Sequence, residues 1–195
     1  MANTNAPSGF KPVGHLNGSS WNGQVRKYHV PVGNAAAIGI GTMVGMLATN
    51  SDTTGVCNDV VGIDGTTGAG ADRPLGPVVS IAHNPEAPRR TYLPAATAGY
   101  VFVADSPDLI MEVQSTAALS ATNMHYNFGI SAESVNTSTG VSTQVIDNPA
   151  TTATYPLRCI GLVDRPDNAL GAYQKVLVKF NTHEFTNMTG VTSGS

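Results

Sequence analysis

Two short acidic motifs are the residues of this chain whose types and spacing most resemble a chemical site. The sequence Asp-x-Pro-Asp occurs at residues 105–108 and again at residues 164–167. Two carboxylates that share a site can bind a cation or act as an acid and base pair, because their repulsion separates their pKa values. The same four residues also favour a tight turn, since proline presets φ and aspartate can hydrogen-bond its own backbone. We favour proline turns, with a calcium site as the alternative.

Other residues that could support catalysis are scattered. The Gly39–Gly45 stretch resembles a dinucleotide-binding fingerprint, but its third glycine is one position late and no helix pattern follows. His183-Glu184 lacks the second histidine of a zinc protease, and no Gly-x-Ser-x-Gly nucleophile motif occurs. We therefore predict no enzyme activity, no catalytic residue, no cofactor and no metal ligand set. The histidines are His15, His29, His83, His125 and His183, and the two cysteines, expected to be reduced, are Cys57 and Cys159.

Composition indicates a strand-rich chain without a nucleic-acid or membrane partner. Of 195 residues only 12% are charged, the net charge is −3, and the 21 glycines and 12 prolines are accompanied by abundant Thr, Ser and Val. A nucleic-acid surface would need a basic stripe, which is absent. No signal peptide pattern and no long apolar run are present, so we expect a protein that is made and used without export.

Apolar runs separated by turn residues predict the elements that would position these groups. Their regular spacing is typical of a mainly β fold, a single antiparallel β-sandwich or barrel domain with at most one short helix, at residues 116–123. Residues 131–153 are polar and are expected to form an exposed excursion. The expected strands are 24–30, 42–47, 59–63, 77–82, 100–104, 109–114, 143–146, 157–163 and 175–180.

The first 31 residues combine aromatic side chains with closely spaced Gly and Pro, which disfavour regular structure. We predict an extended N-terminal arm at 1–31, a β domain at 32–186 and a flexible C-terminal tail at 187–195. The arm is expected to contact a partner or a neighbouring subunit outside its own domain, whereas stacking of a sugar on Trp21 and Tyr28 is the alternative. The predicted contact residues are Phe10, Pro12, His15, Leu16, Trp21 and Tyr28.

Three blocks of the sequence resemble a known family. They contain Pro-Ser-Gly-Phe-Lys-Pro-Val-Gly-His-Leu-Asn-Gly-Ser, Tyr-Leu-Pro-Ala and Leu-Arg-Cys-Ile-Gly-Leu-Val-Asp-Arg-Pro-Asp-Asn, and they cover residues 7–31, 91–114 and 157–183. These blocks are similar to a family of virion structural proteins of tailed bacteriophages that serve as head decoration, or cement, proteins. Residues 50–72 and 131–153 show no such similarity.

The resemblance implies a structural protein on the outer surface of the major capsid shell, stabilising it against internal DNA pressure. The implied partners are the major capsid protein and other copies of the chain, as a trimer or, alternatively, a dimer. The implied location is the capsid surface of the virion, after assembly in the host bacterial cytoplasm. The alternatives are a tail, neck or fibre component, or a glycan-binding module.

Overall fold

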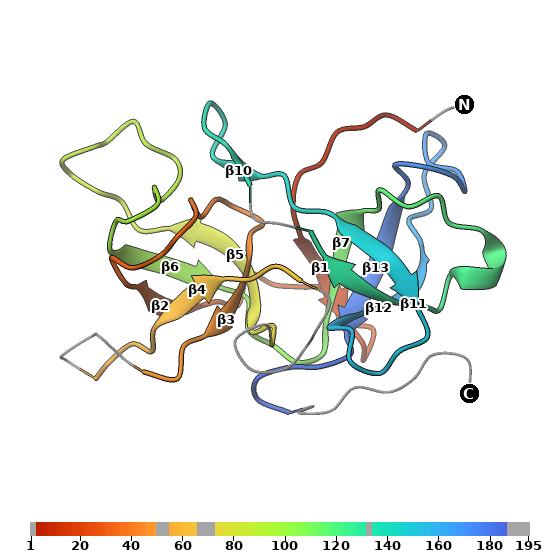
Figure 1. Ribbon diagram of the computed structural model, residues 1–195, viewed down its shortest axis with the longest axis horizontal. Helices are drawn as coiled ribbons and strands as arrows, with labels where there is room; N and C mark the ends of the chain where they lie inside the picture. Colours follow the sequence, from red (N-terminus) through yellow and green to blue (C-terminus); the bar gives the residue numbers. More distant parts are fainter. Residues whose placement is uncertain (1–2, 50–54, 66–72, 132–133, 187–195) are drawn as a thin grey trace.

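The structure of the chain, a computed structural model, describes residues 3–49, 55–65, 73–131 and 134–186. Two antiparallel β-sheets, of six and five strands, form the framework of this part of the chain. The five-stranded sheet lies at the left of Figure 1 and the six-stranded sheet at the right. A single turn of 3₁₀ helix, Ala121–Asn123, is the only helical element among the described residues. The predicted mainly β, antiparallel fold class is therefore confirmed.

The six-stranded sheet has the order β1-β7-β13-β12-β8-β11. In β13 every second side chain is buried, which is the period of a strand with one face on the core. Val176, Val178 and Phe180 thus point into the larger of two apolar clusters. The strands are β1 (Lys11–His15), β7 (Leu109–Gln114), β8 (Asn127–Ile130), β11 (Ile146–Ala150), β12 (Leu157–Leu162) and β13 (Lys175–Phe180).

The five-stranded sheet, in the order β2-β6-β5-β3-β4, curls until its outer strands meet. The amide of His29 in β2 donates to the carbonyl of Asn58, just before β4, at 3.0 Å. This barrel-like closure surrounds a second apolar cluster, which includes Tyr28, Val30 and Val101. The strands are β2 (Arg26–Val30), β3 (Met43–Met46), β4 (Val60–Gly62), β5 (Gly76–Ile81) and β6 (Gly99–Val103).

One buried amide side chain joins the two sheets. Gln144 is fully buried, and its Oε1 accepts a hydrogen bond from the Met43 amide at 2.8 Å. Its Nε2 donates to the Ile63 carbonyl, also at 2.8 Å. Met43 and Ile63 belong to the five-stranded side of the molecule, yet both pack into the cluster under the six-stranded sheet. Because buried polar groups need partners, Gln144 fixes how the sheets meet.

Most predicted strands coincide with observed ones, but the polar segment 131–153 forms the expected exposed excursion only in part: residues 136–139 are exposed, whereas 144–146 are buried. Ile146 is fully buried and begins β11, which pairs with β8. The predicted strand at 143–146 falls mostly between β10 and β11, and the predicted helix at 116–123 reduces to the 3₁₀ turn. The polar composition of this segment predicted exposure, but Gln144 and Ser142 are buried and have hydrogen-bond partners. The missed strands are β1, β8, β11 and the hairpin of β9 (Val135–Asn136) and β10 (Val141–Ser142).

The N-terminal segment supplies one of the two edge strands of each sheet: β1 lies beside β7, and β2 lies beside β6. Phe10 is only 1% exposed and lies in the larger core cluster. Asn3 accepts from the Ala169 amide at 3.0 Å and donates to the carbonyls of Ala169 and Ala172 at 2.8 Å. The predicted contacts outside their own domain are therefore wrong for Phe10 and for Tyr28, which the protein's own core buries. The predicted tail at 187–195 lies outside the described residues.

Candidate functional site

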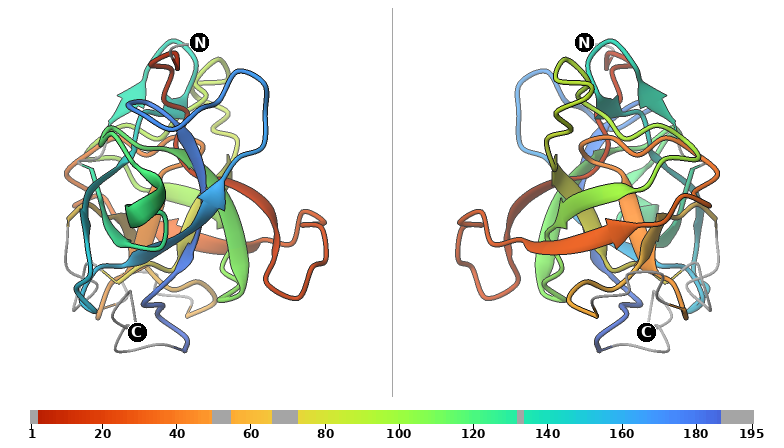
Figure 2. Two further views of the ribbon diagram at one scale, coloured as in Figure 1. Left: turned by 90° about the vertical axis from the view of Figure 1, so that its right-hand side faces the viewer. Right: turned by 90° about the vertical axis from the view of Figure 1, so that its left-hand side faces the viewer.

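The connection between β1 and β2, residues 16–25, projects from the side of the molecule (Figure 2). Asn17 shapes its start, because its Oδ1 accepts hydrogen bonds from the Ser19 amide at 3.0 Å and the Ser19 hydroxyl at 2.7 Å. Gly18 has a φ of +86°, which side chains other than glycine rarely adopt. The His15 amide donates to the Ser19 carbonyl at 2.9 Å. The connection therefore begins with an ordered turn that folds back along β1.

The predicted contact residues are distributed between the core and this projecting connection. Phe10 and Tyr28 are buried, as described above. Pro12, His15 and Trp21 are half-buried, and Leu16 is 46% exposed. Whether the last four contact a partner stays a prediction.

Three exposed apolar side chains, Val13, Leu16 and Val25, lie on or beside the projecting connection. Exposed apolar side chains on a projecting segment are candidates for a protein contact. A mainly apolar cavity of about 340 Å³ lies beside the same segment. Its walls include Pro12, Trp21, Ile40, Val79 and Val141.

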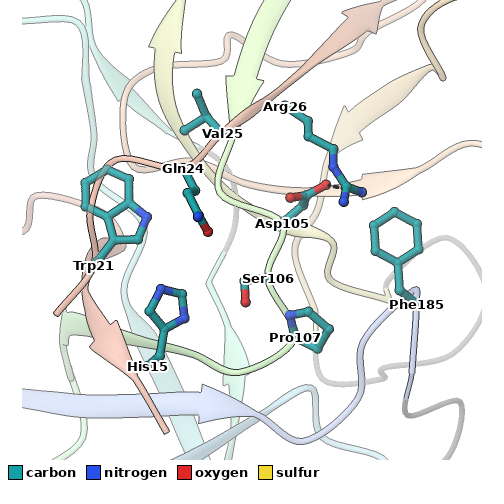
Figure 3. A pocket seen from close by; sticks show the side chains of 9 residues that line it. All are labelled: His15, Trp21, Gln24, Val25, Arg26, Asp105, Ser106, Pro107 and Phe185. Carbon is teal, nitrogen blue, oxygen red and sulfur yellow. Dashed lines mark ion pairs between the residues drawn. The ribbon is translucent and has the colours of Figure 1, made fainter. Parts of the chain in front are cut away.

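A larger groove, of about 720 Å³, lies between the projecting connection and the C-terminal segment. Figure 3 shows the rings of Trp21 and Phe185 on opposite sides of this groove. The amide of Gln24 and the side chain of Ser106 lie between the two rings (Figure 3). The groove thus combines aromatic walls with polar groups at its centre.

Asp105 is the best-positioned charged group of the groove. Its Oδ2 accepts a hydrogen bond from the Tyr28 hydroxyl at 2.7 Å and lies 3.2 Å from a guanidinium nitrogen of Arg26. Burial, together with the Asp105 carboxylate, raises the pKa of Tyr28 well above its usual range. Tyr28 therefore stays protonated and acts as a fixed donor that holds Asp105 in place.

The two Asp-x-Pro-Asp motifs form turns, which confirms that interpretation of their sequence. The Ser106 carbonyl accepts from the Leu109 amide at 3.2 Å, and the Arg165 carbonyl accepts from the Asn168 amide at 3.1 Å. Each proline occupies the second position of its turn, where its fixed φ is favourable. The first turn carries the chain from β6 to β7 and brings Asp105 to the groove, whereas the second joins β12 to β13 within one sheet.

The histidines lie in separate environments. His29 Nδ1 is 2.8 Å from an Asp59 carboxylate oxygen. His183 is fully buried, with Nε2 2.8 Å from the Leu75 carbonyl and Nδ1 accepting from the Phe185 amide at 3.1 Å. Burial lowers the pKa of His183. Within the described residues, no three His, Cys, Asp or Glu side chains are grouped to hold a metal, and no helix is long and apolar enough to cross a membrane.

The chain matches no protein-family model, no curated protein and no solved structure. No relative therefore assigns a role to the surface or the groove.

Sequence reasoning missed the groove because its walls come from distant parts of the chain. Trp21 and Gln24 belong to the N-terminal segment, Asp105 and Ser106 to the β6–β7 turn, and Phe185 to the C-terminal segment. Asp105 was identifiable as a turn residue, but no spacing in the sequence links it to Trp21. No sequence pattern around Phe185 predicts its position, since it is held by the hydrogen bond from its amide to buried His183.

Proposed function

We propose that this chain is a structural protein of a tailed-phage head that binds the outer surface of the major capsid shell and cements it. The observation that carries the proposal is the projecting connection 16–25, on or beside which Val13, Leu16 and Val25 are exposed. The sequence resemblance described above supports the same assignment. The proposed partners are the major capsid protein and further copies of this chain, with a trimer favoured over a dimer.

The contact would be small for each copy and strong only when repeated. Burying one Leu or Val side chain contributes about 1.5–3 kcal/mol at most. Three such side chains give a modest affinity once the cost of association is subtracted. Linked copies in an oligomer bind together, and each further contact becomes intramolecular. A weak contact for each copy and a gain from linked copies are consistent with an oligomer that cements a repeating shell.

The projecting surface is already ordered before any partner binds. Phe10 anchors the segment in the core, and Asn17 and Ser19 fix the turn that follows β1. A segment that was disordered before binding would lose about 1–2 kcal/mol of free energy per ordered residue. This preorganisation leaves more of the interaction energy for attachment.

Binding that occurs only on the assembled shell stabilises the shell by linkage. Bridging neighbouring capsid subunits would therefore raise the free energy needed to separate them under internal DNA pressure. No reacting group is needed for this work.

The test is co-sedimentation with phage heads prepared without this protein. Leu16→Asp places a charge on the projecting connection, and Leu170→Asp is the matched control, because the two leucines are 46% and 49% exposed. We expect Leu16→Asp to weaken attachment at least tenfold, which corresponds to about 1.4 kcal/mol, while Leu170→Asp attaches like the wild type. Both variants should melt like the wild type, since neither side chain is in the core.

Equal attachment of both variants would contradict the assignment of this surface. Electron microscopy of virions would separate the head from the tail, neck or fibre: density for this chain confined to the tail would contradict capsid decoration. Sedimentation equilibrium of the purified protein would distinguish a trimer from a dimer.

A further inference from the structure

We propose that the groove between Trp21 and Phe185 is a binding site for a neutral saccharide. The groove does not include Leu16, which the proposal above assigns to capsid attachment, although exposed Val25 lines the groove as well. The groove volume of about 720 Å³ is in the range of pockets that take small organic ligands.

The two aromatic rings supply the apolar part of the site. Phe185 is 45% exposed and stands across the groove from Trp21 (Figure 3). Aromatic faces carry partial negative charge, and the C–H groups on one face of a pyranose ring carry partial positive charge. A sugar ring can therefore stack on Trp21 while its hydroxyls face the centre, and Phe185, with the Arg26 guanidinium 5.9 Å from its ring centroid, forms the opposite wall.

The centre of the groove offers hydrogen-bond donors and acceptors of the kinds that hydroxyl groups need. Gln24 presents an amide, which both donates and accepts, and Ser106 presents a hydroxyl. Within the described residues, the hydrogen bond from Tyr28 and the ion pair with Arg26 both use Oδ2 of Asp105. Asp105 Oδ1 can thus accept from a sugar hydroxyl, while Arg26 beside it can donate to a neighbouring one.

The charges of the groove favour a neutral sugar over an acidic one. Arg26 and Asp105 form an ion pair at 3.2 Å, so neither leaves an uncompensated charge to attract a carboxylate or phosphate. A second carboxylate near Asp105 would be repelled. Charged side chains that are already paired still offer hydrogen bonds to hydroxyl groups.

The site is built before a ligand arrives. Tyr28 donates to Asp105 from inside the second apolar cluster, and the Pro107 turn fixes the backbone that carries Asp105. Phe185 is placed by the bond from its amide to buried His183. A preformed pocket binds with little loss of conformational entropy.

The full-length protein provides its own probe, because Trp21 is the only tryptophan of the chain. An array printed with neutral and acidic oligosaccharides identifies a binding sugar, and titration of the strongest neutral one is followed by tryptophan fluorescence. We expect a saturable change in Trp21 fluorescence. Calorimetry then compares variants without relying on the tryptophan signal.

Phe185→Ala and Gln24→Ala should each weaken binding at least tenfold, with melting temperatures close to that of the wild type. Tyr173→Ala is the matched control, because Tyr173 is an aromatic residue that is 38% exposed and lies outside the groove. We expect it to bind like the wild type. Three results would overturn the proposal: no neutral sugar bound up to about 10 mM, binding of acidic sugars alone, or unchanged binding in both groove variants. None of these depends on Leu16, so a failure here leaves capsid attachment untouched.

Discussion

Replacing Phe10 by alanine should destabilise the whole fold, although Phe10 lies only ten residues from the start of the chain. Its ring is 1% exposed and packs in the larger core cluster with side chains of both sheets. Truncation of a buried phenylalanine to alanine costs about 3–5 kcal/mol, because apolar contacts are lost and a cavity remains. For a chain of this size each kcal/mol lowers the melting temperature by about 2–4 °C. We therefore expect a fall of roughly 6–20 °C.

The measurement is thermal unfolding by circular dichroism, with urea unfolding as a check that the m-value is unchanged. Leu16→Ala is the control from the same segment, because Leu16 is 46% exposed and its truncation should change stability by less than about 0.5 kcal/mol. Gly9→Ala is a second variant: a Cβ there would lie 2.5 Å from the Gly41 carbonyl oxygen, at a φ of +65°. It should also destabilise. If Phe10→Ala and Gly9→Ala both melt like Leu16→Ala, the segment is detached in solution and its placement in the core is wrong.

Three further predictions concern buried polar groups and a thiol. Acidification should destabilise the protein through His183: its pKa is below the usual value of about 6.5, so the unfolded chain takes up the proton first. The free energy of unfolding should be highest above about pH 6.5 and fall below that pH by up to about 1.4 kcal/mol per pH unit. Urea unfolding of His183→Asn at several pH values should give a free energy that falls less steeply with decreasing pH, and an equally steep fall would contradict this. Gln144→Leu leaves the Met43 amide and the Ile63 carbonyl unpaired and should cost about 1–3 kcal/mol for each in urea unfolding, whereas an unchanged midpoint would show that Gln144 does not join the sheets. Burial raises the pKa of Cys159 to about 11, so mass spectrometry should find this thiol unmodified by iodoacetamide near pH 8 until the protein is unfolded; modification of the folded protein would show that it is accessible.

Strands whose side chains alternate between apolar and polar were predictable from the sequence. In β13 the run Lys-Val-Leu-Val-Lys-Phe buries every second residue, and the Asp-Ser-Pro-Asp turn before β7 carries its own local signal. Strand β8 was not predictable in this way, because all four of its residues are buried and the period of two disappears.

Partners supplied by distant parts of the chain account for the remaining errors. Gln144 lies in a polar stretch that looks exposed until Met43 and Ile63 provide its hydrogen bonds. Phe10 lies among glycines and prolines that disfavour regular structure, yet β1 forms because β7 offers it a free edge. Local propensity describes what a segment prefers alone, and tertiary pairing overrides it here.

The burial of Phe10 also changes the physical account of attachment. A detached arm would gain its aromatic contacts only on the capsid, and its affinity would be reduced by the cost of ordering the segment. In this structure the core makes the Phe10 contacts, and exposed Leu16 remains for the proposed capsid contact. Two variants then separate anchoring from contact: Phe10→Ala should lower both the melting temperature and capsid attachment, because it loosens the base of the projecting connection. Leu16→Asp should lower attachment alone. With a detached arm, Phe10→Ala would also lose attachment, but the melting temperature would be unchanged.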